Sequence, residues 1–243
     1  MRLPSLRVGS RSIRSMGILS GFIALGLGAC SSDDNNGGGG SGTTSFVGTV
    51  VGGANNDESG SLTFDIAGTA LAPPASITTM STSLTVTGTL TLVSPAAGTQ
   101  ALTGTYDDAT NQLDLSGGGY TFTGVFDGTS RLEGTYNGAN GAGLFVTALD
   151  LGNAVAFCGS FAGDDDGTWN FVVNGTTLSG SALTSSGNAA PLDGTVTAGA
   201  VSIVNPLDTQ GPPLATGTIT GTTATGIWDD GQGSSGTWTG NGC

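Results

Sequence analysis

A two-residue alternation of apolar and polar side chains recurs along the chain after residue 45. From Leu84 to Leu92, every second position holds an apolar residue or glycine, and threonine stands between them. Tyr120 to Phe126 has a similar pattern, with Thr121 and Thr123 between the inward positions. Successive side chains of a β-strand point to opposite faces, so this alternation is typical of antiparallel strands with one face in water. Because no helical periodicity follows residue 45, the sequence predicts an all-β fold.

The pattern also restarts about 111 residues along the chain. Phe46-x-Gly48 is matched by Phe157-x-Gly159, and Gly60-x-Leu62-x-Phe64 is matched by Gly167-x-Trp169-x-Phe171. Runs bounded by Gly, Asn, Asp and Ser give about eight strands per unit at roughly ten-residue spacing. We therefore predict a tandem duplication with a first unit at 46–150 and a second at 156–243.

Connections this short permit only hairpins, and a meander of about eight strands removes its two exposed edges by closing. The sequence thus predicts two tandem antiparallel up-and-down meander barrels of about eight strands each. One barrel built from both units is the alternative. Glycines within the strands share the face of the large apolar residues, where a Cβ would obstruct tight coiling of neighbouring strands.

The N-terminus carries a different signal. Arg2, Arg7, Arg11 and Arg14 precede an apolar run that ends in Leu27-Gly28-Ala29-Cys30. A basic region, a short apolar region and small residues before the cleavage point are the parts of a secretory signal. The last four residues resemble the lipobox of bacterial lipoprotein precursors. This resemblance implies that residues 1–29 are removed and that Cys30 carries the lipid anchor, including a palmitate-type acyl chain.

Residues 30–45 consist mainly of Ser, Asp, Asn, Gly and Thr, which predicts a flexible tether between the anchor and the first unit. Ser31 and Ser32 follow the cysteine, with no aspartate beside it. By resemblance to lipoprotein sorting in Gram-negative bacteria, this implies the outer membrane as the location in the cell envelope. Whether the body faces the periplasm or the medium stays open.

Charge restricts the possible functions. Removal of the first 29 residues leaves Arg131 as the one basic residue against 18 acidic residues, and the chain contains no histidine. Such a surface repels phosphate backbones, so nucleic acid is not expected as a partner. Without histidine, the chain has no Ser-His-Asp or Cys-His catalytic site. It also has no zinc or haem site that uses a histidine ligand. We expect no enzymatic activity and no required cofactor.

Cys158 and Cys243 form an even pair after lipidation of Cys30, in an oxidising compartment. Their parity against Phe157 and Trp238 places both on the outer face. In a closed barrel with an even number of strands, the first strand lies beside the last. We therefore predict a Cys158–Cys243 disulfide across the seam of the second barrel, with two free thiols as the alternative.

Acidic residues gather in two loops of the second unit that closure would bring to one rim: Asp164, Asp165, Asp166, Asp229 and Asp230. Carboxylates suit a hard cation such as Ca²⁺, so these five residues form a candidate calcium site. The alternative is that aspartate begins turns through hydrogen bonds of its own side chain.

Trp169, Trp228 and Trp238 have inward parity, and small barrels are usually filled by their own side chains. We expect them to pack in the core, with a sugar or lipid pocket as the alternative. The Gly-Thr-Tyr and Gly-Thr-Trp strands, such as Gly134-Thr135-Tyr136 and Gly236-Thr237-Trp238, resemble strands of avidin-type and lipocalin-like barrels and of the barrel lobes of surface lipoproteins.

Taken together, these features favour a non-catalytic cell-envelope lipoprotein that acts as a binding or structural module. Its partner would be an unidentified envelope component or small ligand, in addition to the membrane at Cys30. The alternative is a carbohydrate-active enzyme that uses the rim carboxylates as acid and base.

Overall fold

The computed structural model describes residues 42–68, 83–204 and 211–243. These residues form strands joined by turns. The strands of the first half are β1 (Thr43–Gly52), β2 (Glu58–Ala67), β3 (Ser83–Ser94), β4 (Gly98–Asp107), β5 (Gln112–Gly117), β6 (Tyr120–Phe126), β7 (Arg131–Gly138) and β8 (Gly141–Leu149).

The strands of the second half are β9 (Ala154–Gly163), β10 (Gly167–Asn174), β11 (Thr177–Thr184), β12 (Ala189–Thr197), β13 (Ala200–Val204), β14 (Ala215–Thr220), β15 (Thr223–Asp229) and β16 (Ser235–Gly242). Eight strands among the described residues of this half agree with the number expected from the turn residues. No helix within the described ranges has the length and apolar character needed to cross a bilayer.

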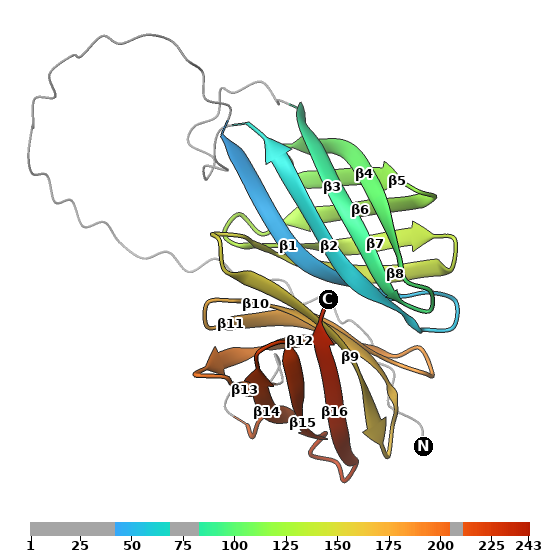
Figure 1. Cartoon of the computed structure of the whole chain (residues 1–243), viewed down its shortest axis with the longest axis vertical. Helices are drawn as coiled ribbons and strands as arrows, with labels where there is room; N and C mark the ends of the chain where they lie inside the picture. The colour runs from blue at the N-terminus through green and yellow to red at the C-terminus, as the bar shows by residue number, and fades with distance from the viewer. Residues whose placement is uncertain (1–41, 69–82, 205–210) are drawn as a thin grey trace, which may run out of the picture. The chain divides into compact units, whose positions relative to one another are not determined.

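Each half closes into its own barrel, with every strand antiparallel to its neighbours in chain order (Figure 1). The first barrel closes where β1 pairs with β8, with Phe46 opposite Leu149. The second closes where β16 pairs with β9, with Trp238 opposite Phe161. The prediction of two eight-stranded meander barrels is confirmed, and the single barrel made from both units is not formed.

Motifs matched in the sequence occupy corresponding strands of the two barrels. Phe46 lies on β1 and Phe157 on β9, while Phe64 lies on β2 and Phe171 on β10. Two boundaries differ from expectation. The second barrel begins at Ala154 of β9 and not at residue 156. In the first barrel, β1 begins at Thr43 and pairs to Ala67 at the end of β2, so residues 43–45 belong to the barrel and not to the tether. Cys30 and the rest of the expected signal and tether up to residue 41 lie outside the described residues.

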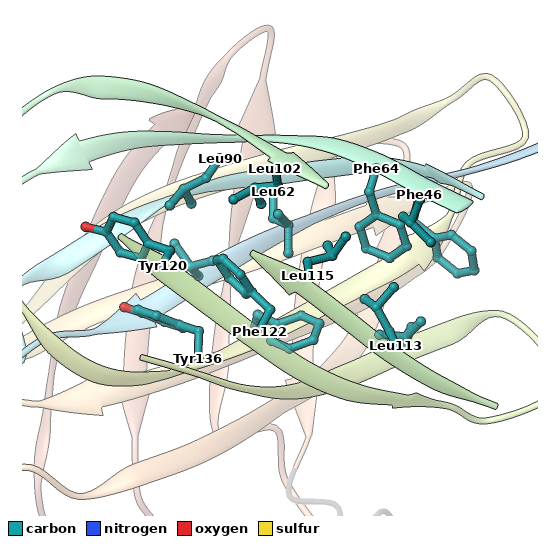
Figure 2. Close-up of a cluster of buried hydrophobic side chains, with 14 of the residues drawn as sticks. Phe46, Leu62, Phe64, Leu90, Leu102, Leu113, Leu115, Tyr120, Phe122 and Tyr136 are labelled. Atoms are coloured by element: carbon teal, nitrogen blue, oxygen red, sulfur yellow. The ribbon is translucent and has the colours of Figure 1, made fainter. Parts of the chain in front are cut away.

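Large apolar side chains fill the first barrel. Rings stack at both ends of this core, with centroids 5.0 Å apart for Phe46 and Phe64 and 5.4 Å apart for Phe122 and Tyr136. Figure 2 shows leucines between the two ring groups and the tyrosine hydroxyl groups directed away from Phe46 and Phe64. Burial of this apolar surface supplies the main driving force for folding of the barrel.

The two barrels belong to one compact unit and contact each other through β1, β2 and β8 on one side and β9, β10 and β11 on the other. Asn170 on the outer face of β10 is fully buried there. Its amide donates a hydrogen bond to the Val50 carbonyl, and its Oδ1 accepts one from Ser59 Oγ at 2.9 Å. These hydrogen bonds offset the cost of burying the polar Asn170 side chain, which would otherwise destabilise the fold.

The structure contains the disulfide predicted between Cys158 and Cys243, with the two Cα atoms 5.7 Å apart. Cys158 lies on β9 opposite Asn241 of β16, so the bond fastens the barrel seam. The sequence predicted that the Cys158 side chain faces outward from the barrel, and in the structure this side chain is buried. Ser61 Oγ of the first barrel donates a hydrogen bond to the Cys243 carbonyl, which shows that the first barrel reaches this seam.

Candidate functional site

The second barrel is not filled by its own side chains. It contains a cavity of about 190 Å³ that opens at the end where β15 stops and β16 begins. A cavity of about 150 Å³ in an apolar core is enough to hold benzene. Every strand of the second barrel, β9 to β16, contributes to the lining, and two residues come from loops. The lining residues are Phe161, Trp169, Phe171, Ala182, Leu192, Ile203, Leu214, Ala215, Trp228, Asp229, Asp230 and Trp238.

Two small residues account for the space. Leu90 pairs with Leu62 in the first barrel, and Ala182 pairs with Trp169 at the matching place in the second. Ala182 therefore stands where the first barrel has Leu90, and it faces Trp169 where the first barrel has Leu62.

The second small residue lies across the cavity. Phe122 pairs with Tyr136 in the first barrel, and Ala215 pairs with Trp228 at the matching place in the second. An alanine thus replaces a phenylalanine ring that is fully buried in the first barrel. Both replacements line the cavity.

All three tryptophans line the cavity, and each indole N–H is already used. Trp169 Nε1 donates to the Ser160 carbonyl at 3.0 Å, Trp228 Nε1 to Ala162 at 3.3 Å and Trp238 Nε1 to Ile227 at 3.2 Å. These are carbonyls of the barrel wall, so the rings present their apolar surfaces to the cavity and their donors to the strands.

The expectation that the tryptophans pack in the core holds in part. Trp169 and Trp238 are buried and their ring centroids are 5.2 Å apart, edge to face. Trp228 is only partly buried and packs edge to face on Phe161. The same rings therefore form both the core and the cavity wall, which combines the two alternatives that parity left open.

The two acidic loops lie next to each other at the open end of this barrel, as predicted from closure. Asp164 Oδ2 accepts a hydrogen bond from the Ser235 N–H at 2.9 Å, which joins the β9–β10 loop to the β15–β16 loop. Asp229 Oδ1 accepts from the Gly231 N–H. Asp230 Oδ1 accepts from the Gln232 and Ser234 N–H groups, and these bonds hold the pKa of Asp230 below its usual value.

These bonds are those of aspartates that shape turns. Asp165 Oδ1 likewise accepts from the Asp166 N–H within its own loop. Within residues 42–68, 83–204 and 211–243, no group of three or more His, Cys, Asp or Glu is arranged to hold a metal ion. The calcium site on Asp164, Asp165, Asp166, Asp229 and Asp230 stays a prediction, which calorimetric titration with Ca²⁺ tests.

The corresponding end of the first barrel is closed by a buried polar cluster. Glu58 is fully buried, and its Oε2 accepts hydrogen bonds from the Tyr120 hydroxyl at 2.9 Å and from Asn140 Nδ2 at 2.7 Å. Burial raises the pKa of Tyr120 to about 12, and the hydrogen bond to Glu58 acts in the same direction. Tyr136 packs on Tyr120 with ring centroids 6.2 Å apart. Among the described residues, buried side chains therefore occupy this end of the first barrel, where the second barrel has its opening.

Glu58 was not singled out as a candidate functional residue from the sequence. The signal was present, because Glu58 shares parity with Gly60, Leu62 and Phe64 of the same strand. A charged residue at the first position of a strand does not by itself show whether the barrel end is open.

Comparisons with known proteins identify no family. No protein-family model matches the chain, and no curated protein matches it. Among solved structures, a protein assigned as an AttH from Nitrosomonas europaea is 11% identical, with 82% of this chain and 91% of that chain covered and a TM-score of 0.24. The Burkholderia oklahomensis agglutinin is 15% identical, with 82% and 84% covered and a TM-score of 0.19. Scores this low carry no inference about the present chain.

Proposed function

We propose that the chain is a lipid-anchored protein of the bacterial cell envelope that acts as a non-catalytic binding module, with the cavity of the second barrel as its binding site. The observation that carries this proposal is the cavity itself: an open, apolar space of about 190 Å³ with all three tryptophans in its lining. Concave sites lined by aromatic side chains, with a few polar groups at defined places, are typical of small-molecule binding.

The contrast between the barrels supports a binding role. Two barrels of one topology fill their interiors differently, because Ala182 and Ala215 stand in the second where Leu90 and Phe122 stand in the first. An unfilled core lowers stability, since cavity-lining atoms lose packing contacts. A ligand of matching size would restore those contacts.

The alternative function, a carbohydrate-active enzyme, would use rim carboxylates as acid and base. A general acid needs a raised pKa, whereas backbone N–H groups lower the pKa of Asp230. A sugar also needs hydrogen-bond partners, and the indole N–H groups of the wall are engaged with strand carbonyls. Both features favour binding of an apolar group.

The substitution Ala182→Leu tests the cavity, because it places in the second barrel the residue that the first barrel holds at the same position. The probe is 4-phenylbutanol, a neutral molecule with one ring, and the readout is tryptophan fluorescence, since all three tryptophans line the site. We expect wild-type protein to bind the probe and Ala182→Leu to bind it at least about tenfold more weakly.

Ala200→Leu is the matched control, because Ala200 is exposed at the start of β13 in the same barrel. It should bind the probe like wild type. Ala182→Leu should be no less stable than wild type, since each methylene buried in a void contributes roughly 0.8 kcal/mol. Equal affinity in wild type and Ala182→Leu, or no binding to wild type, would contradict the assignment of the site.

The anchor is tested separately. In a Gram-negative host, the wild-type chain should incorporate labelled palmitate and partition into detergent, and Cys30→Ala should do neither, because the thiol is the proposed point of acylation. Ser31→Ala is the control and should be labelled like wild type. Incorporation of labelled palmitate by the Cys30→Ala variant would rule out a lipid anchor at Cys30.

A further inference from the structure

The cavity wall sets the chemistry of a ligand's inner part. The three indole N–H groups donate to Ser160, Ala162 and Ile227, and the other wall side chains within the barrel are aliphatic or phenyl groups. A polar group placed among them would lose its water without gaining a hydrogen bond, which is costly. The part of a ligand that enters the barrel is therefore apolar and about the size of one ring with a short chain.

The mouth sets the chemistry of the outer part. Asp229 and Asp230 are the two charged residues among those that line the cavity, and since the cavity surface itself is almost wholly apolar, their carboxylates stand at its edge. Each uses Oδ1 to hold its loop, through Gly231 N–H for Asp229 and through Gln232 and Ser234 N–H for Asp230. These backbone hydrogen bonds do not involve Oδ2 of either carboxylate, and the Ser234 side chain also interacts with Asp230.

Within residues 42–68, 83–204 and 211–243, no basic side chain neutralises this mouth. Beyond Arg14 the sequence has a single basic residue, Arg131, and no histidine. Arg131 lies on β7 of the first barrel, where its guanidinium forms ion pairs with Glu133 at 2.6 Å and Asp193 at 2.7 Å. The mouth of the cavity therefore carries uncompensated negative charge, which attracts cations and repels anions.

We propose that the cavity binds a small cationic amphiphile: an apolar body of about one ring among the tryptophans, and an ammonium-type head between Asp229 and Asp230. This inference rests on the proposed function, because it assigns a ligand class to the same site. Trp228 lies at this mouth beside the two aspartates, and an aromatic face adds attraction for a cation. Ligands with a carboxylate head, such as fatty acids, are disfavoured by the same charges.

Three probes that differ only in the head group test the proposal: 4-phenylbutylamine, 4-phenylbutanol and 4-phenylbutanoate. We expect the amine, charged near neutral pH, to bind about tenfold more tightly than the alcohol at low salt, and the carboxylate to bind most weakly. Raising the salt concentration should narrow the difference between amine and alcohol, because ions screen charges near the surface.

The variant Asp229→Asn with Asp230→Asn removes both charges but keeps an Oδ1 acceptor for the loop N–H groups. It should bind the amine and the alcohol equally, with alcohol affinity unchanged from wild type. The matched control, Asp165→Asn with Asp166→Asn, removes two rim charges that do not line the cavity and should keep most of the preference for the amine.

The head-group assignment would be overturned if the amine and the alcohol bound wild type equally, or if the carboxylate bound more tightly than the alcohol. Either result would leave the cavity as a binding site. A preference that survives in the Asp229 and Asp230 variant would also overturn it. Absence of binding for all three probes would overturn the proposed function, and the ligand class with it.

Discussion

Replacing Gly104 by alanine should destabilise the first barrel by roughly 3 kcal/mol, at the upper end of the cost of inserting atoms into a packed core. Gly104 lies in the middle of β4, opposite Leu115 of β5. A Cβ at this position would overlap the Asp114 carbonyl oxygen and approach Leu115 Cα within 2.9 Å. Because both are backbone atoms of the neighbouring strand, no side-chain rotation can relieve the overlap.

Gly98 provides the matched control, because it is the first residue of the same strand and a Cβ there would meet no atom within 4 Å. Gly98→Ala should leave stability unchanged or raise it slightly, since alanine restricts the unfolded chain. Chemical denaturation followed by circular dichroism measures both variants. Equal midpoints for Gly104→Ala and Gly98→Ala would show that close strand approach does not require the mid-strand glycine.

Removal of the seam disulfide should have a similarly large effect on the second barrel. The bond joins residues separated by 85 positions, so it greatly restricts the unfolded chain. In the chain-entropy model a loop of this length contributes about 4 kcal/mol. The double variant Cys158→Ala with Cys243→Ala should lose about that much stability in denaturation followed by tryptophan fluorescence, which reports the second barrel.

Reductant offers the control for this change. It should lower the stability of wild type to that of the double variant and should leave the double variant unaffected, because the variant has no bond to reduce. A double variant whose midpoint matches that of oxidised wild type would show that pairing of β16 with β9 holds the seam without the covalent link.

Much of the fold could be predicted because its determinants are local. Alternation such as Leu84 to Leu92 fixes which face of a strand is buried, and short turns fix which strands are neighbours. Closure follows from the need to remove edges, and it correctly predicted the seam between Cys158 and Cys243. It also predicted that the loops with Asp164 and Asp230 lie at one rim, where Asp164 bonds to Ser235.

The cavity could not be predicted in the same way, because it depends on what side chains leave empty. The alternation places Ala182 and Ala215 at inward-facing positions of their strands, like any core residue. Only the strand register shows that they lie opposite Trp169 and Trp228. That a large side chain is missing at these two positions becomes clear only when they are compared with Leu90 and Phe122 of the first barrel.

Burial between barrels was hidden from the sequence for a related reason. Asn170 has outward parity, which for a single barrel indicates contact with water. Its side chain is instead buried against Val50 and Ser59 of the other barrel. Local periodicity assigns a face to a residue, but it does not say what covers that face.

A crystal structure of the chain with 4-phenylbutylamine tests the central claim most directly. We expect density for one ligand in the second barrel, with its ring among Trp169, Trp228 and Trp238 and its nitrogen within hydrogen-bond distance of Asp229 or Asp230. The first barrel, closed by Glu58 and Tyr120, should contain none. A second barrel whose tryptophans close the space, with the ligand absent or bound elsewhere, would contradict the account.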